Sequence, residues 1–439
     1  MDRQDPKQNS SSLQSLPSEL LSNVFGYAPQ GALYQLTLVN KRIGQLAVPA
    51  LYESFSQYGG DSTQVRQYFR TAQRVPELAK HPRDITIQGS LKITHKQVRK
   101  CLRNISKESW VQNLYLYDPQ LAYKYFSYGP DLAVLLLLSL DPKVRSIRAL
   151  HPPNPIKHGH GLLLPVYLEP IRAMLAAGDA LPPWTNTLST LEISLRLLSW
   201  RCIAPLFRLP VLKTLILNDG CELAVGAEGR MNHKASTEVA ILARSSSIEE
   251  LDFGRCIVSS TTVANAVSAC KTLRILRHMD CIDDKGSENL RLFKRLHEHA
   301  NTLHTLKTCC WESAESQLIN GGVFADFTAL AQLEMHCLDV VASLLPPNLR
   351  RLVLRANADD AVGLMVGMTM LAPTLSKRPE IDIILHYVQF KTPDRKSIPK
   401  LSRLPAIFAK LGLNLSLHVC PPISEICKYI PETILSNLS

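Results

Sequence analysis

The feature that most constrains the fold of this chain is an apolar triplet that recurs along much of its length. The second and third members lie three and five residues after the first. The last two members are two residues apart, as on the buried face of a short strand, and the first turns the chain into that strand. The clear copies are Val111-Leu114-Leu116, Val144-Ile147-Ala149, Leu188-Leu191-Ile193, Leu212-Leu215-Leu217, Ile248-Leu251-Phe253, Leu330-Leu333-Met335 and Leu349-Leu352-Leu354. Weaker copies begin at Leu273 and Leu303, and residues 85–87 indicate an earlier strand.

Helix-like stretches lie between the triplets, at residues 237–244, 261–270 and 287–299. Stacking such helix-then-strand units gives a parallel sheet with helices on its outer face. The chain closes on the same alternation: strand 381–385, helix 402–410, strand 413–419 and a capping helix at 423–438. We therefore predict an α/β fold with a parallel sheet and outer helices.

The spacing of the triplets leaves an alternative open. It runs from 19 residues, between Leu330 and Leu349, to 44 residues, between Val144 and Leu188. Regular leucine-rich repeats span about 20–29 residues. An irregular repeat array and a non-repeating α/β domain both remain compatible with the pattern.

Residues 16–55 carry three short helical patterns, at 16–25, 32–40 and 42–51, and Pro49 is expected to kink or split the last one. A segment of about 40 residues without cysteine or histidine rarely buries enough surface to fold alone. Its apolar stripes are most simply explained as an interface with helices laid against another protein. The alternative is a helical cap on the domain that follows.

The residues of this segment resemble an F-box of the fungal type. The resemblance rests on Leu16-Pro17-x-Glu19-Leu20-Leu21-x-x-Val24-Phe25, Val39-Asn40-Lys41-Arg42 and Leu51-Tyr52, which occur in the right order and spacing. Many members carry an aromatic residue where this chain has Ile43 and a cysteine where it has Asn40. The region that follows is similar to the divergent leucine-rich-repeat part that often accompanies an F-box.

The resemblance implies contact with the Skp-type adaptor of a cullin-RING ubiquitin ligase. The implied contact residues are Leu16, Pro17, Leu20, Leu21, Phe25, Leu33, Leu36 and Val39, with Asn40 and Lys41 at the edge. The polar residues 1–15 predict a disordered leader, and we expect an F-box-like unit at 16–55, a helical linker at 56–80 and a degenerate leucine-rich-repeat-like domain at 81–439. The expected function is substrate recognition for ubiquitination. The rival is a leucine-rich-repeat scaffold unrelated to ubiquitin.

The sequence gives little support to catalysis or to a cofactor. It contains no G-x-S-x-G elbow, phosphate-binding loop, strand followed by G-x-G-x-x-G, or H-E-x-x-H. Eleven cysteines without a C-x-x-C pair argue against disulfides and zinc, and Cys309-Cys310 are expected to be buried packing. The pairs His158/His160 and His297/His299 lack helical zinc spacing and are expected on solvated faces. We therefore predict a non-enzyme without metal or cofactor.

Composition and hydropathy are typical of a soluble protein of the cytoplasm or nucleus. Residues 1–15 lack the apolar core of a signal peptide. The apolar run 132–140 is too short to span a membrane, and we expect it to form a buried helix. The formal net charge is +11, and residues 66–103 hold ten Lys and Arg against Glu77 and Asp84. Without interleaved aromatic residues this window favours a solvated helix face, or an acidic protein partner, over nucleic acid.

Overall fold

The computed structural model describes most of the chain between residues 15 and 420. The described ranges are 15–59, 63–89, 143–150, 181–195, 197–198, 200–222, 243–254, 256–278, 280–281, 286–308, 324–336, 345–357, 372–373, 375–388, 404–410 and 412–420, with single residues 134, 137, 138, 168, 171, 175 and 368. Predictions for the Val111 triplet, for His158 and His160, for Cys309-Cys310, and for a helix at 423–438 lie outside these residues.

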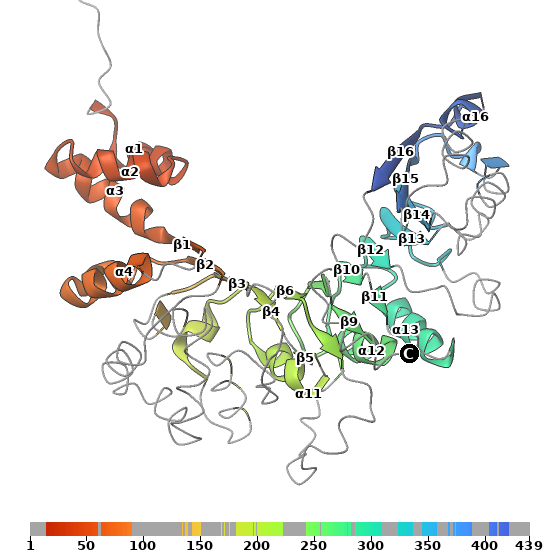
Figure 1. Cartoon of the computed structure of the whole chain (residues 1–439), viewed down its shortest axis with the longest axis horizontal. Helices are drawn as coiled ribbons and strands as arrows, with labels where there is room; N and C mark the ends of the chain where they lie inside the picture. Colours follow the sequence, from red (N-terminus) through yellow and green to blue (C-terminus); the bar gives the residue numbers. More distant parts are fainter. Residues whose placement is uncertain are drawn as a thin grey trace, which may run out of the picture.

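The chain is an α/β protein built on one twelve-stranded sheet, and every pair of neighbouring strands in it is parallel. The strands are β1 (Ser54–Tyr58), β2 (Asp84–Gln88), β3 (Ser146–Leu150), β4 (Thr190–Ser194), β6 (Thr214–Asn218), β8 (Glu250–Asp252), β10 (Ile275–His278), β12 (Thr305–Thr308), β13 (Gln332–His336), β14 (Arg351–Asn357), β15 (Asp382–Val388) and β16 (Leu415–Cys420). They lie in the order of the sequence, along the arc seen in Figure 1. The predicted α/β class and parallel sheet are confirmed.

The triplets account for most of this sheet because their second members, which point into the core, pair in register on neighbouring strands. Leu191 of β4 is the partner of Leu215 of β6, which is in turn the partner of Leu251 of β8. All three side chains are buried. The weaker copies after Leu273 and Leu303 form β10 and β12 in the same way. Each strand thus extends the apolar face of the one before it.

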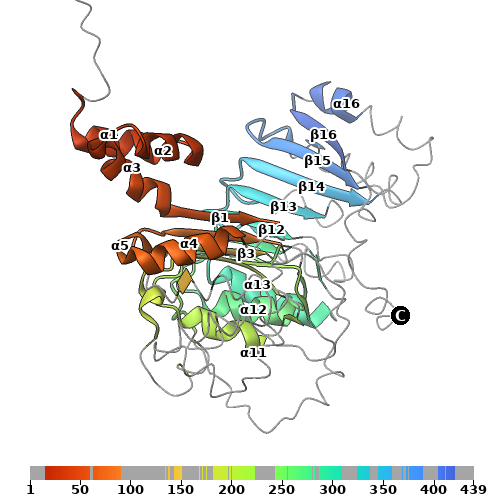
Figure 2. The same ribbon diagram turned by 60° about the vertical axis from the view of Figure 1, so that its left-hand side comes forward.

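Helices pack against the apolar face of the sheet and close the core. The helices after β1 whose bounds the structure describes are α4 (Thr63–Arg74), α5 (Pro76–Ala79), α11 (Trp200–Ile203), α12 (Ser260–Ala269), α13 (Gly286–His297) and α16 (Leu404–Lys410), with 3-10 turns η2 (Pro183–Asn186) and η3 (Ala204–Arg208). Predictions for 261–270, 287–299 and 402–410 match α12, α13 and α16. In Figure 2, α11, α12 and α13 lie together on one side of the sheet. Val134, Leu137 and Leu138 of the predicted buried helix are helical and buried.

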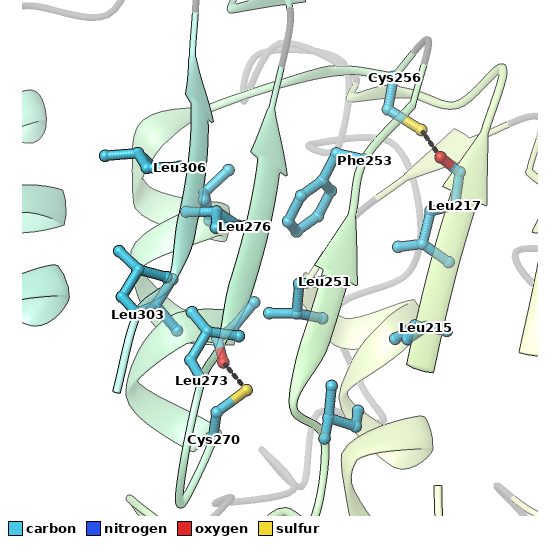
Figure 3. Close-up of a cluster of buried hydrophobic side chains, with 14 of the residues drawn as sticks. Leu215, Leu217, Leu251, Phe253, Cys256, Cys270, Leu273, Leu276, Leu303 and Leu306 are labelled. Atoms are coloured by element: carbon cyan, nitrogen blue, oxygen red, sulfur yellow. Dashed lines mark hydrogen bonds between the residues drawn. The ribbon is translucent and has the colours of Figure 1, made fainter. Parts of the chain in front are cut away.

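Buried leucines, one aromatic ring and two thiols form the central part of this core (Figure 3). Phe253, directly after β8, and Leu276 of β10 lie between Leu217 and Leu306. A second, four-stranded parallel sheet lies beside the core at the carboxyl ends of the main strands. It consists of β5 (Leu197–Leu198), β7 (Cys221–Glu222), β9 (Ile257–Val258) and β11 (Asp280–Cys281).

Three helices precede the sheet: α1 (Ser18–Gly26), α2 (Gln30–Thr37) and α3 (Lys41–Glu53). Pro49 lies inside α3 and does not split it. These helices have a small core of their own, which is separate from the large cluster under the sheet. Figure 1 and Figure 2 both show them as a group beyond β1.

The join between the three helices and the sheet has no loop, because α3 ends at Glu53 and β1 begins at Ser54. The predicted helical linker at 56–80 is therefore not helical at its start, because residues 56–58 belong to strand β1 of the sheet. Within the same segment, Thr63–Arg74 and Pro76–Ala79 are helical, as α4 and α5. Among the residues that the structure describes, no helix has both the length and the apolar character needed to cross a bilayer.

Candidate interaction surfaces

The small core of α1–α3 contains three of the predicted contact residues. Leu21, Phe25 and Leu33 are almost completely buried, where they pack with Ile43 and Ala47 of α3. On α1, Leu21 and Phe25 are one helical turn apart and face the same way. These three side chains hold the helices together, which departs from their predicted role as contacts to another protein.

The outer side of α1 and α2 is apolar as well. Leu20 and Val24, also one turn apart on α1, are each 50% exposed. Tyr34 and Leu38, four residues apart in and just after α2, are more than half exposed, as is the predicted contact residue Val39. Exposed apolar residues are gathered here, since all but Tyr58 and Val75 of the large exposed ones within the described ranges fall between residues 20 and 39.

Sequence reasoning had named Leu20 and Val39 as contacts but not four other exposed residues, Val24, Tyr27, Tyr34 and Leu38. Tyr27, directly after α1, is 93% exposed. The helical spacing of Leu20–Val24 and Tyr34–Leu38 is the signal that points to Val24, Tyr34 and Leu38, and it does not include Tyr27. The buried pair Leu21 and Phe25 has the same spacing on the same helix. Spacing alone therefore does not tell which of the two stripes faces outward.

The remaining predicted contacts have mixed surroundings. Pro17 and Lys41 are exposed, whereas Leu16 and Leu36 are partly buried against the small core. Asn40 caps α3, because its side-chain oxygen accepts a hydrogen bond from the Ile43 N–H at 2.9 Å. Asn40 therefore has a structural role in positioning the start of α3.

Side-chain contacts secure the join between α3 and the sheet. Glu53, the last residue of α3, pairs with Arg145 before β3, with Nη2 and Oε1 3.0 Å apart. The Phe55 and Tyr68 rings meet edge to face, with centroids 5.2 Å apart. Burial is the main reason why the pKa of Asp84 in β2 is raised, and the Arg145 charge opposes it. The helices and the first strands thus share contacts on both sides of the junction.

The open face of the sheet, opposite the core, carries a second candidate surface made of ion pairs. Arg148 of β3 pairs with Glu192 of β4 at 2.9 Å. Arg277 of β10 contacts both Glu250 and Asp252 of β8. These partners lie side by side because the strands are in register, which puts the same face of each strand in one row.

Farther along the same face, one carboxylate forms ion pairs with two cationic side chains. Glu334 of β13 pairs with Lys307 of β12 at 3.1 Å and with Nε of Arg355 of β14. The Glu334 side chain is only 13% exposed. Next to this trio, the rings of His386 on β15 and His418 on β16 stack with centroids 5.3 Å apart. Sequence reasoning missed this row, because it depends on the register between strands whose separation in sequence varies.

Burial also overturns one prediction about histidines. His297 is exposed and lies 3.1 Å from Asp326, as expected for a solvated position. His299 is buried, so the prediction of a solvated face is wrong for this residue. Its Nδ1 accepts the Leu273 N–H at 3.3 Å, which leaves Nε2 to donate to the Val267 carbonyl at 3.1 Å. The pKa of His299 is lowered, chiefly by burial.

The predicted basic helix face corresponds to α4. Arg70 and Arg74 are exposed, whereas Val65 and Tyr68 are buried against the sheet. Residues 90–103 of the basic window lie outside the described ranges. Within those ranges, no three His, Cys, Asp or Glu side chains gather in a way that would hold a metal ion.

Comparison of the chain with protein-family models finds no matching family, and a search of curated proteins finds no relative.

Proposed function

We propose that this protein is the substrate-recognition subunit of a Skp-cullin-F-box ubiquitin ligase. Its three N-terminal helices bind a Skp-type adaptor, and through it a cullin, while the parallel sheet holds a protein substrate. The sheet is then an irregular leucine-rich-repeat-like solenoid. The mechanism is proximity: a substrate lysine is kept at high effective concentration near the charged ubiquitin carrier, and this chain makes no bond itself.

The observation that carries the proposal is the apolar outer side of α1 and α2. The three helices already fill their own core with Leu21, Phe25 and Leu33. Leu20 and Val24 are therefore not needed for that core and remain half exposed. Helices that present such residues to solvent are typical of helix-in-groove recognition, in which a few anchors supply most of the affinity.

The separation of the two hydrophobic clusters weighs against the rival scaffold function. A helical cap would bury its apolar side chains against the first repeat. Here the buried residues of α1–α3 pack on one another and are distinct from those under the sheet, and among the described residues of these helices Tyr52 alone packs against the large cluster. The order of the strands supports the repeat array, because each new strand of the main sheet is added beside the preceding one.

Adaptor capture by a double variant tests the proposal. Leu20→Asp with Val24→Asp places two charges on the outer side of α1, so binding to a purified Skp-type adaptor is expected to fall by at least about 30-fold, the loss of one hot spot of about 2 kcal/mol. Leu21 is avoided because an aspartate there would unfold the helices. Calorimetric titration of the adaptor gives the affinity.

The matched control is Ser22→Asp with Asn23→Asp, which adds the same charge at exposed positions of the same helix. It is expected to bind the adaptor within about threefold of the original chain, as surface substitutions away from an interface do. Wild-type protein that captures no adaptor, while circular dichroism shows it folded, would favour the scaffold function instead.

A further inference from the structure

The open face of the last strands gathers basic and imidazole side chains in one row. Arg355 of β14 is the register partner of His386 of β15, and His386 is the partner of His418 of β16. Parallel strands lie about 4.8 Å apart, so the three side chains leave the sheet next to one another. The two imidazoles are nearly parallel, at 26°. The row also includes the backbone position of His336 on β13.

The charges around this row are unbalanced. Glu334 is shared by Lys307 and Arg355, so one carboxylate faces two cations. Arg355 uses Nε for this contact, and the fork of its terminal nitrogens retains further N–H donors. Arg351 and Asp382 form a further ion pair on this face of β12–β16, and that pair is internally neutral. Among the described residues of this face, the charges therefore sum to +1 with neutral histidines.

We propose that Arg355, His386 and His418 form a binding site for an oxyanion of the phosphate-monoester class. A phosphate monoester carries a charge of about −1.5 to −2 and three acceptor oxygens. The guanidinium donates in a fork that matches two of those oxygens, and ring N–H groups of His386 and His418 on the neighbouring strands donate to the third. The ligand thereby supplies the negative charge that Glu334 alone does not.

A metal ion fits this row less well. Two histidines are a common start of a metal site, but among the side chains that the structure describes no third His, Cys, Asp or Glu gathers with His386 and His418. Arg355 is the direct neighbour of His386, and Lys307 lies on the far side of Glu334. The fixed positive charges of Arg355 and Lys307 repel a divalent cation from this row and attract an anion to it.

Protonation of His386 is coupled to the ligand. Burial is the largest cause that lowers the pKa of His386. Arg355, His418 and Lys307 lower it further, and Glu334 opposes them. A bound dianion favours the charged ring, so binding takes up protons and becomes tighter as the pH falls. His418 is exposed and can be replaced with little effect on the core.

Titration of the full chain with inorganic sulfate and inorganic phosphate tests the site. Sulfate stays dianionic across the range, so its pH dependence reports the protein alone. We expect sulfate to shift two histidine ring proton resonances and to bind about tenfold more tightly near pH 6 than near pH 7.5. His418→Gln is expected to weaken sulfate binding about tenfold near pH 6 through the loss of one charge-assisted hydrogen bond. The control His304→Gln, at an exposed position before β12, should leave the affinity unchanged.

A second variant separates an oxyanion from a metal. Glu334→Gln releases both cations, so sulfate affinity is expected to rise severalfold, whereas a metal site would not gain from losing a carboxylate. A short peptide with a central phosphoserine and its unphosphorylated twin then identify the source. Binding of the phosphopeptide assigns the site to a phosphorylated polypeptide, and binding of inorganic phosphate alone assigns it to a small molecule. Ring resonances that ignore sulfate and phosphate, or that respond only to Zn²⁺, would overturn the proposal.

Discussion

Leu273 donates its backbone N–H to Nδ1 of the buried His299, and this hydrogen bond fixes which ring nitrogen of His299 carries the proton. Nε2–H then donates to the Val267 carbonyl in α12. The neutral ring thus ties the residues after α13 to α12 and to the segment that enters β10. A second proton on Nδ1 would remove the acceptor that Leu273 needs.

The protein is expected to lose stability on mild acidification because of this ring. Burial lowers the pKa of His299 from its ordinary 6.5, so the unfolded chain binds more protons than the folded chain below that pH. The stabilisation is present above about pH 6.5 and is lost as the pH falls toward the folded pKa. Urea unfolding between about pH 7.5 and pH 5 measures it. His299→Leu should cost about 1–3 kcal/mol at neutral pH by leaving the Leu273 N–H unpaired, and should flatten the pH dependence. If the unfolding free energy of His299→Leu depends on pH as steeply as that of the original chain, another residue causes the pH dependence.

Gly254→Ala is expected to destabilise the sheet region by roughly 2 kcal/mol or more. Gly254 has φ +41°, and a Cβ there would lie 2.9 Å from the Leu217 carbonyl oxygen. The Asn218 side chain is also in the way and is held by its hydrogen bond to Glu192. The shift of the thermal midpoint measures the cost. Gly26→Ala is the control, because a Cβ there meets nothing within 4 Å. Equal effects of the two changes would contradict this account.

Phe25→Ala is expected to loosen the three N-terminal helices without unfolding the sheet. Removing a buried phenylalanine costs about 3–5 kcal/mol, and Phe25 belongs to the cluster confined to α1–α3. Hydrogen exchange should therefore show lost protection in α1–α3 and retained protection in β6 and β8. The matched change Phe253→Ala, in the large core, should do the reverse. One common loss of protection in both variants would mean that the two cores unfold as a unit.

Cys256 and Cys270 are expected to resist alkylation in the folded protein. Both are buried, and their thiols donate to the carbonyls of Leu217 and Ala266 at 3.2 and 3.3 Å. Burial raises the pKa of the Cys270 thiol, which keeps it in the unreactive protonated form. Mass spectrometry after iodoacetamide treatment should find both unlabelled, and labelled after denaturation. Rapid labelling of the native chain would contradict their burial.

The spacing of apolar residues predicted much of the sheet because a strand with one buried face repeats every two residues. Leu215 and Leu217 show this directly in β6. Strand β1 could not be found in this way, since one of its two inward positions is Gln57, a buried polar residue. The two-residue strands of the smaller sheet are too short to give a period.

The surfaces were less accessible to sequence reasoning than the core. Leu20 and Leu21 are adjacent and chemically identical, yet one is half exposed and the other is buried. Which stripe faces inward is decided by the position of α3, which the spacing does not give. The ion pair between Lys307 and Glu334 depends in the same way on register, because the two residues lie far apart in the sequence.

Because no loop separates Glu53 from Ser54, the rotation of α3 about its own axis determines the orientation in which strand β1 begins. One residue of an α-helix corresponds to a turn of about 100° and a rise of about 1.5 Å. A single residue inserted at this boundary would leave the buried residues of the small core together but would displace Tyr52, which packs against the large cluster beside Tyr68. It would also turn the curved sheet to a different direction relative to any protein bound to α1 and α2.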